Sequence, residues 1–254
     1  YRILSGLVIF LAILVRVLRL SQLPPSLYWE EAALGYDAYS ILKTGRDHHG
    51  NLLPLAAFES FGDWKPSLYF YTAVPTIAIF GLNEWGVRLP SVVAGVMIVV
   101  GIGQLVKLIY SKLKNKPAGL NEKLIQLLAM LVAAISPWAI HFSRAAWESN
   151  LATALILWAV ISGFKFLQGK SFRHLVRAAI LLILSTYAYH AARITSPIVG
   201  LSLVAVAVKT KRLTLAQTQV RKKILILGLA SIALMLPLLL KLRSAEFTAR
   251  ATQT

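Results

Sequence analysis

The chain has 254 residues, 57% of them hydrophobic, with a mean hydropathy of +0.66, which excludes an ordinary soluble domain of this length. It contains no cysteine, so disulfide bonds and thiolate metal sites are excluded as well. The formal net charge of +17 comes largely from short basic clusters between apolar runs, which is typical of cytoplasmic loops in membrane proteins and not of nucleic-acid-binding proteins.

Seven apolar runs are predicted to be membrane-spanning helices, because each comes close to the roughly 20 residues that a span requires. The first run has no small-residue cleavage site, so we expect a retained helix and not a signal peptide. The fifth and sixth runs are short and must extend into flanking residues. The predicted spans are residues 3–20, 88–109, 124–141, 150–167, 178–190, 196–208 and 224–240. The expected fold is therefore an all-α integral membrane protein.

The segment between the first two spans, residues 21–87, is predicted to be an ordered outer loop that carries function. Within it, residues 30–43 have the pattern of an amphipathic helix, which Gly45 and the GRDHHG turn are expected to end. Residues 68–82 are apolar but too few for a comfortable span, and Pro75 lies in their middle. We expect them to form a juxtamembrane or re-entrant segment on the outer face.

The basic clusters predict the orientation of the chain. Clusters at 107–123, 165–177 and 209–223 all lie on the cytoplasmic side if the N-terminus is inside and seven spans alternate. Counting residues 68–82 as a full span would break this parity. Of the ten acidic residues, only Glu122 then falls inside. The outer acids are Glu30, Glu31, Asp37, Asp47, Glu59, Asp63, Glu84, Glu148 and Glu246. Such an excess indicates an outer site that needs carboxylates.

Three outer patches combine ionisable and aromatic side chains. The first is YWEEAALGYDAY at residues 28–39, which contains Glu30 and Glu31. The second is the segment 135–150, which contains His141, Arg144 and Glu148. The third is the segment 186–197, which contains His190 and Arg193. Together the patches suit a phosphorylated lipid, since cations bind phosphate, aromatic rings face the chain or a sugar, and a carboxylate activates an acceptor hydroxyl.

Each charged residue also has a purely structural explanation. The adjacent acids suit a helix N-terminus, where the macrodipole favours negative charge. Arg144 and Glu148 stand four residues apart and can pair on one helix face. Basic residues at helix ends, such as Lys65, Arg88 and Arg193, commonly extend to the membrane interface.

The histidine pair His48 and His49, next to Asp47, allows a metal site, but adjacent histidines in a glycine-flanked turn are more often surface residues. No metal is therefore assigned, and a divalent metal stays the open alternative. Asp37 is interpreted as an ordinary helix-face acid.

The outer segments resemble motifs of bacterial glycosyltransferases of the GT-C superfamily. They read WEEAALGYDAYSILKTGRDHHGNLLP, FGDWKPSLYFY, FGLNEWGVRLPSVVAG and ISPWAIHFSRAAWESN. The nearest branch is the lipid-carrier-dependent one related to protein O-mannosyltransferases and lipid A aminoarabinose transferases. The resemblance covers essentially the whole chain and is specific to the superfamily, not to a substrate. It implies a GT-C fold with juxtamembrane helices in the first outer loop, and residues 1–254 are expected to be the conserved seven-span module without the family's variable C-terminal part.

The resemblance also implies roles for individual residues. Glu30 stands where the family has the first acid of an Asp-Glu pair, the proposed general base, and Glu31 is its companion. Lys65 matches the lysine of a Glu-Lys-Pro motif in related enzymes, and Asp63 is the candidate to replace the acid that is missing beside it. Arg193 stands where these enzymes bind the donor phosphate.

Three further residues, Arg144, Glu148 and His190, are expected from the outer motifs to position or bind substrate. The implied activity is transfer of a sugar from a polyprenyl-phosphate donor, with inversion, to a protein, lipid or glycan acceptor on the outer side of the cytoplasmic membrane. Membrane lipids are the other expected partners, and nucleic acid is not. A polytopic transporter or flippase of lipid-linked substrates is the alternative; it predicts ionisable residues deep inside spans, whereas the mid-span stretches 92–105 and 224–236 carry no charge.

Overall fold

The structure is a computed structural model that describes residues 1–113, 119, 121–169, 171–210 and 218–240. These residues are mostly helical, with one small β-hairpin. In chain order the elements are α1 (Arg2–Val17), α2 (Trp29–Thr44), β1 (Ala57–Ser60), β2 (Asp63–Pro66), α3 (Leu68–Phe80), α4 (Glu84–Tyr110), α5 (Glu122–Ile135), α6 (Pro137–Arg144), α7 (Glu148–Leu167), α8 (Arg173–Ala188), α9 (Ala192–Lys209) and α10 (Thr218–Leu240).

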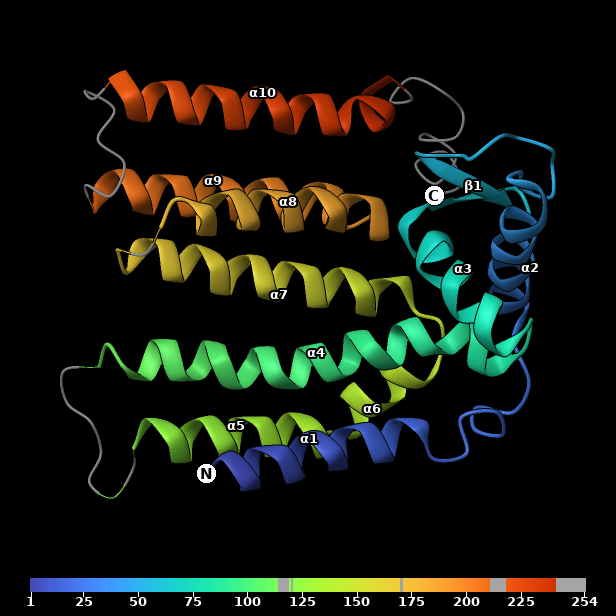
Figure 1. The fold of residues 1–254 in the computed structure, drawn as a ribbon, viewed down its shortest axis with the longest axis horizontal. Helices are drawn as coiled ribbons and strands as arrows, with labels where there is room; N and C mark the ends of the chain where they lie inside the picture. The colour runs from blue at the N-terminus through green and yellow to red at the C-terminus, as the bar shows by residue number, and fades with distance from the viewer. Residues whose placement is uncertain (114–118, 120, 170, 211–217, 241–254) are drawn as a thin grey trace.

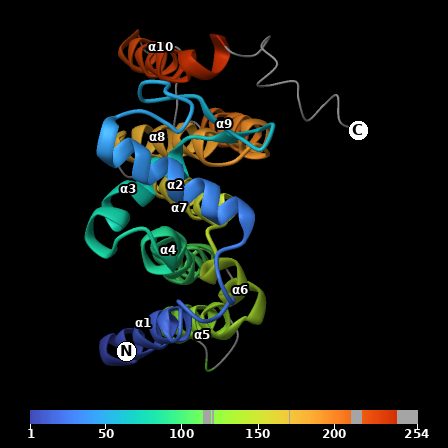
Figure 2. The ribbon, with the colours of Figure 1, turned by 90° about the vertical axis from the view of Figure 1, so that its right-hand side faces the viewer.

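The long helices lie side by side as a stack. Figure 1 shows α1 and α5 at one side, then α4, α7, the pair α8 and α9, and α10 at the other side. Neighbours in this stack are in contact, with α4 packed on both α5 and α7, and α7 packed on α8. The short helices α2 and α3 and the hairpin gather at one end of the stack (Figure 1), where α2 crosses the ends of the longer helices (Figure 2).

Among the described residues, three helices are long and apolar enough to cross a membrane, namely α4, α7 and α9. The bent pair α5 and α6 makes a fourth if it is one span. Each of the seven predicted apolar runs overlaps a helix, but α1 and α8 have only 16 residues each, and the apolar part of α10 is also short. The structure is therefore compatible with an all-α membrane protein, and in the part of the chain that it describes fewer than seven helices meet the length and composition of a span.

The prediction of one continuous helix over residues 124–141 is wrong. Helix α5 ends at Ile135, and α6 begins at Pro137 with a bend of 58° between them. Proline has no backbone N–H and is favoured in the first turn of a helix, so Pro137 starts a new helix here. The hydroxyl of Ser136 accepts a hydrogen bond from the N–H of Ala139 and caps that start.

Lysines lie in the last turns of three helices at one end of the stack, and acids lie in the first turns of two helices at the other. Lys107, Lys165 and Lys209 lie in the last turns of α4, α7 and α9, and these helix ends share the end of the stack opposite the hairpin (Figure 1). Glu84 and Glu148 lie in the first turns of α4 and α7, at the hairpin end. This separation matches the arrangement that the sequence predicts for basic and acidic loops.

The predicted helix at residues 30–43 is confirmed as α2, and Gly45 follows it in the left-handed conformation with φ 69°. That conformation is open to glycine without steric cost. The hairpin was not predicted. Its two-residue turn, Phe61 and Gly62, has φ angles of 53° and 75°, as a tight hairpin between right-twisted strands requires.

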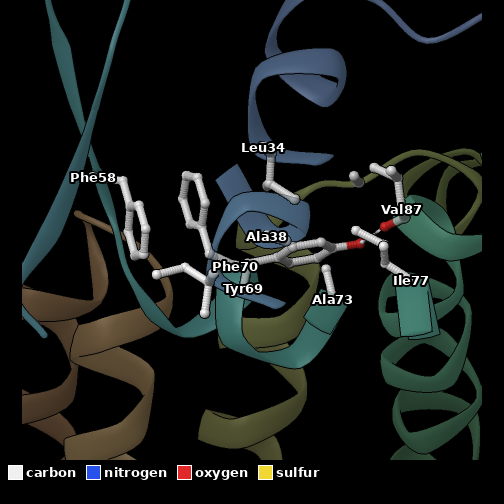
Figure 3. Close-up of a cluster of buried hydrophobic side chains, with 10 residues drawn as sticks. Leu34, Ala38, Phe58, Tyr69, Phe70, Ala73, Ile77 and Val87 are labelled. Carbon is white, nitrogen blue, oxygen red and sulfur yellow. Dashed lines mark hydrogen bonds between the residues drawn. The ribbon is translucent and has the colours of Figure 1, made fainter. Parts of the chain in front are cut away.

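A buried apolar cluster joins α2, the hairpin, α3 and α4 into one unit. Figure 3 shows the rings of Phe58 and Phe70 stacked, with centroids 4.2 Å apart. The buried Tyr69 donates its hydroxyl to the carbonyl of Val87 at 3.1 Å, which ties α3 to α4. Burying such side chains stabilises the fold by roughly 1.5–3 kcal/mol each. The segment 68–82, predicted to be juxtamembrane or re-entrant, is thus mostly the helix α3, which packs on α2, β1 and α4.

Candidate active site

A cavity of about 300 Å³ lies where the start of α2, the hairpin, α3 and the start of α7 meet. Its charged lining residues are Glu30, Lys65 and Glu148, three of the residues that the sequence singles out. Aromatic rings form much of the remaining wall, contributed by Tyr28, Phe70, Phe142, Trp147 and Tyr189. Segments far apart in the sequence therefore place carboxylates, a cation and aromatic side chains in one space.

The closest charged contact in the cavity joins Lys65 to Glu30. The Lys65 ammonium donates to Glu30 Oε1 at 2.7 Å, and its Nζ lies 3.3 Å from Asp63 Oδ2. Lys65 is on β2, where it pairs with Phe58 of β1, so the hairpin fixes the direction of its side chain. The Lys65 side chain is 10% exposed and that of Glu30 is 29% exposed. The cation is therefore well shielded, while the carboxylate keeps access to a ligand.

The surroundings of Lys65 favour its charged form. Burial by itself lowers the pKa of this amine, but the hydrogen bond to Glu30 and the negative charges of Glu148, Glu30 and Asp63 outweigh burial and raise the pKa above its ordinary value. Lys65 is thus an ammonium group at neutral pH. It suits the binding of an anion such as phosphate and not the role of a proton acceptor.

Tyr28 stands at the N-terminal boundary of α2 and lines the same cavity. Burial is the main cause that raises the pKa of its phenol, and the charges of Glu30, Glu31 and Glu148 raise it further. The phenol stays neutral and remains a hydrogen-bond donor. Its ring lies 5.6 Å from that of Trp147, within the range of aromatic pairs.

Glu31 does not line this cavity and is fully buried against Arg88. Arg88 donates from Nε to Glu31 Oε1 at 3.0 Å and from Nη2 to Glu31 Oε2 at 2.9 Å. The N–H of Ala146 also donates to Glu31 Oε1, at 2.7 Å. Glu31, grouped with Glu30 as catalytic from the sequence, therefore links α2, α4 and the α6–α7 connection, and it is not among the residues that line the cavity.

Arg88 is the main structural residue that the sequence reasoning missed, since it was interpreted as an interfacial cation. Its guanidinium is completely buried, and besides Glu31 it binds the carbonyl oxygens of Leu20, Pro24 and Ser26. The signal in the sequence was an arginine at the first position of the apolar run 88–109, where burial of the charge requires a partner.

His190 and Arg193 lie beside the hairpin at the start of α9. The Arg193 guanidinium donates from Nη1 to His190 Nδ1 at 3.0 Å. Because a guanidinium only donates, Nδ1 of His190 is the acceptor, and Nε2–H donates to the carbonyl of Trp64 at 2.7 Å. This chain of contacts brings Arg193 toward the strand that carries Lys65. Tyr189, the residue before His190, lines the cavity.

Arg144, expected to position or bind substrate, instead contacts the end of α1. Its guanidinium donates to the carbonyl oxygens of Val15, Arg16, Leu18, Arg19 and Leu23. These are orphan acceptors of a helix C-terminus and the turn after it, so Arg144 acts as a cap for α1.

Asp37 is not an ordinary helix-face acid, so that interpretation is wrong. Its side chain is completely buried, and Oδ1 accepts from the backbone N–H of His48 at 2.9 Å and lies 2.7 Å from His48 Nδ1. The histidine turn is thereby docked on α2. Within the described ranges, the one group of three residues able to hold a metal ion is His48, His49 and Glu59, whose ligand atoms lie within 4.8 Å of one another.

The chain matches no protein-family model, no curated protein and no solved structure. The cavity that contains Glu30 and Lys65 brings together residues from all three of the segments that are predicted to share one membrane face.

Proposed function

We propose that the chain is a membrane glycosyltransferase that moves a sugar from a polyprenyl-phosphate donor to an acceptor on the outer side of the cytoplasmic membrane, with inversion. The observation that carries the proposal is the contact of Glu30 with Lys65 at 2.7 Å in a cavity that Glu148 also lines. A carboxylate next to a shielded ammonium provides a base and an anion-binding group within one substrate's reach.

In the proposed reaction, Glu30 accepts the proton of the acceptor nucleophile while the nucleophile's oxygen or nitrogen forms a bond to the anomeric carbon. The bond from that carbon to the donor phosphate breaks on the opposite face, and the phosphate leaves with the electron pair. Lys65, with Arg193 nearby, neutralises the developing phosphate charge. Lys65 exchanges its bond to Glu30 for one to phosphate, so donor binding releases the carboxylate for its role as base.

An apolar groove next to the hairpin suits the polyprenyl chain of such a donor. A second cavity, of about 520 Å³, lies between α3, α8 and α10 and is lined mainly by apolar side chains. They include Leu55, Leu68, Tyr71, Ile183 and Pro237. Leu68 lines this groove and Tyr189 lines the polar cavity. Both side chains pack against the same buried cluster of α7, α8 and α9 residues, so the two cavities are neighbours. A long isoprenoid has no need of hydrogen bonds and fits such a lining.

The proposed topology has seven spans, formed by α1, α4, the α5–α6 pair, α7, α8, α9 and α10. Their side-by-side packing and the separation of basic and acidic helix ends support this arrangement. By the positive-inside rule the hairpin end faces outward, which puts the cavity at the outer membrane surface. Spans as short as 16 residues require local thinning of the bilayer or flanking residues that complete the crossing.

The experiment is a transfer assay with the membrane-reconstituted protein, a radiolabelled polyprenyl-phosphate sugar and a mixed acceptor fraction. Glu30→Gln should lower the transfer rate by roughly 10²–10⁴-fold, because the amide cannot accept the proton. Glu84→Gln is the matched control, since Glu84 also lies in the first turn of a helix at the same end of the stack but does not line the cavity. Its rate should equal that of the unchanged protein.

Two results would contradict the proposal. Full transfer by the folded Glu30→Gln variant would remove Glu30 from the reaction. The protein would instead be identified as a flippase if it moved the intact lipid-linked sugar across the bilayer and transferred no sugar to any acceptor.

A further inference from the structure

A second cluster of functional side chains lies outside the cavity, at the outer edge of the hairpin. It comprises His48 and His49 of the α2–β1 loop and Glu59 of β1, and none of the three lines the cavity. One nitrogen from each histidine and one carboxylate oxygen lie within 4.8 Å of one another. Both histidine side chains are accessible from solvent, so a soluble ion can reach them.

The local backbone explains how two adjacent histidines face the same side. Asp47 is buried, and its Oδ1 accepts from the N–H groups of His49 and Asn51 at 3.0 and 2.7 Å. Asp47 Oδ2 accepts from the side-chain amide of Asn51 at 2.9 Å. This tight turn brings the two imidazole rings together, with centroids 3.8 Å apart. In an extended strand they would point to opposite faces.

Asp37 prepares His48 to be a ligand. Its Oδ1 lies 2.7 Å from His48 Nδ1, so Nδ1 carries the proton and Nε2 keeps its lone pair. A buried carboxylate on the second ring nitrogen is the usual support of a metal-binding histidine, because it fixes the tautomer and the ring orientation. A surface histidine pair with no ligand role has no need of this arrangement.

Glu59 completes the set from the hairpin. Its Oε1 accepts from the N–H of Gly62 at 2.9 Å, which holds the carboxylate at the hairpin turn, while Oε2 contacts His49 Nε2. Two imidazole nitrogens and one carboxylate oxygen are a ligand set that zinc favours, with a fourth position left for water. Calcium and magnesium prefer all-oxygen sites and are not expected here.

We propose that His48, His49 and Glu59 bind a zinc-class divalent cation, with Asp37 orienting His48 from α2. The ion links the histidine turn to β1 and so braces the hairpin whose other strand presents Lys65. The proposal is independent of the transferase reaction, because it concerns ligands outside the cavity.

The test is zinc binding by the purified, tag-free full chain in detergent after chelator treatment, measured by calorimetry, with cobalt absorption as a second probe. We expect one zinc ion per chain. His49→Gln and Glu59→Gln should each weaken binding at least tenfold, and Asp37→Asn should weaken it by roughly 10–100-fold. His141→Gln is the matched control, an exposed histidine on α6 outside the cluster, and should bind as the unchanged protein does.

Thermal unfolding of each variant without zinc verifies that it is folded, and zinc should raise the unfolding temperature only where it binds. Absence of saturable zinc binding by the unchanged chain would overturn the proposal. Equal affinity in the folded His49→Gln and Glu59→Gln variants would overturn it too, and unchanged affinity in Asp37→Asn would remove Asp37 from the site.

Discussion

Lys65 Nζ and Glu30 Oε1 lie 2.7 Å apart, although 35 positions separate the two residues in the sequence. The contact ties the first turn of α2 to the second strand of the hairpin. The same ion pair is proposed to open when the donor phosphate binds. Its strength and its pH dependence therefore affect both the unfolding free energy of the chain and the proposed sugar transfer.

The first prediction concerns the pH range in which this pair stabilises the fold. The pKa of Lys65 in the folded chain is above its ordinary value of 10.5, which is approximately its value in the unfolded chain. The folded state therefore binds the Lys65 proton more tightly, and the resulting stabilisation is complete below pH 10.5 and is lost as the pH rises through the raised pKa. Glu30→Gln removes the main cause that raises this pKa.

The measurement is the unfolding temperature of the unchanged protein and of Glu30→Gln across the pH range. The gap between them should be constant around neutral pH and should shrink only above about pH 10.5. A gap that already closes between pH 6 and pH 8 would show that another group, and not Lys65, controls the interaction.

The second prediction separates the two adjacent glutamates by stability. Glu31→Gln leaves the buried Arg88 without its counter-charge, and removing one partner of a buried pair costs about 3–5 kcal/mol of unfolding free energy. For a chain of this size we expect a fall in unfolding temperature of roughly 6–20 °C. Glu30→Gln, at a partly exposed position, should lower it much less.

The contrast between these variants is the decisive observation. Glu31→Gln should lower the unfolding temperature, and its transfer rate should fall only in proportion to the fraction of protein that is folded. If Glu31→Gln is as stable as the unchanged chain yet inactive, while Glu30→Gln transfers sugar normally, then the roles assigned to the two acids are reversed.

The sequence predicts the helices well because apolar runs of this length have few alternatives. All seven predicted runs overlap helices, and Gly45 ends α2 as expected. The bend at Ser136 was missed even though Pro137 marks it, because the hydrophobic run continues through the break. The hairpin was missed because its strands have four residues each, too short for a clear alternation.

Three of the eight residues that the sequence singles out as a site line the cavity, and the connections of the others were not predicted. Glu30, Lys65 and Glu148 do meet in one cavity, as a common membrane face suggests. The partners of Arg144, Glu31 and Asp37 were not predictable from spacing. Their contacts join segments brought together only by tertiary packing, and periodicity gives no information about which distant element a buried charge meets.

The third prediction tests whether Arg144 is architectural. Its planar guanidinium donates hydrogen bonds to several carbonyl oxygens at the end of α1. A lysine ammonium cannot make the same set of hydrogen bonds. Arg144→Lys should therefore lower the unfolding temperature, while the KM for the donor, measured on folded protein, should change less than about twofold because the donors of Arg144 are held by carbonyl oxygens at the end of α1.

Arg193→Lys is the matched comparison, because it makes the same substitution beside His190 near the hairpin. There we expect the donor KM to rise severalfold with little change in stability. A raised donor KM for Arg144→Lys at an unchanged unfolding temperature would restore the donor-binding role that the family resemblance implies.

The last prediction concerns Gly95, where α4 passes close to the C-terminal end of α6 and to α1. A Cβ atom at this position would lie 2.0 Å from Ser143 Oγ and 3.0 Å from Arg16 Nε, two atoms that hydrogen-bond to each other. Gly95→Ala should therefore break that bond or push the helices apart, at a cost of about 1–3 kcal/mol. Gly6→Ala in α1 is the control, because its Cβ would meet nothing within 4 Å, and it should be neutral or slightly stabilising.

The double variant Gly95→Ala with Ser143→Gly distinguishes a steric cause from a change in helix propensity. Removing the Ser143 side chain deletes both of the closest clashing atoms, so part of the lost stability should return even though the hydrogen bond from Arg16 is gone. If the loss of stability in the double variant equals the sum of the two single losses, the two substitutions act independently, and the close approach of α4 to Ser143 is not what requires glycine at position 95.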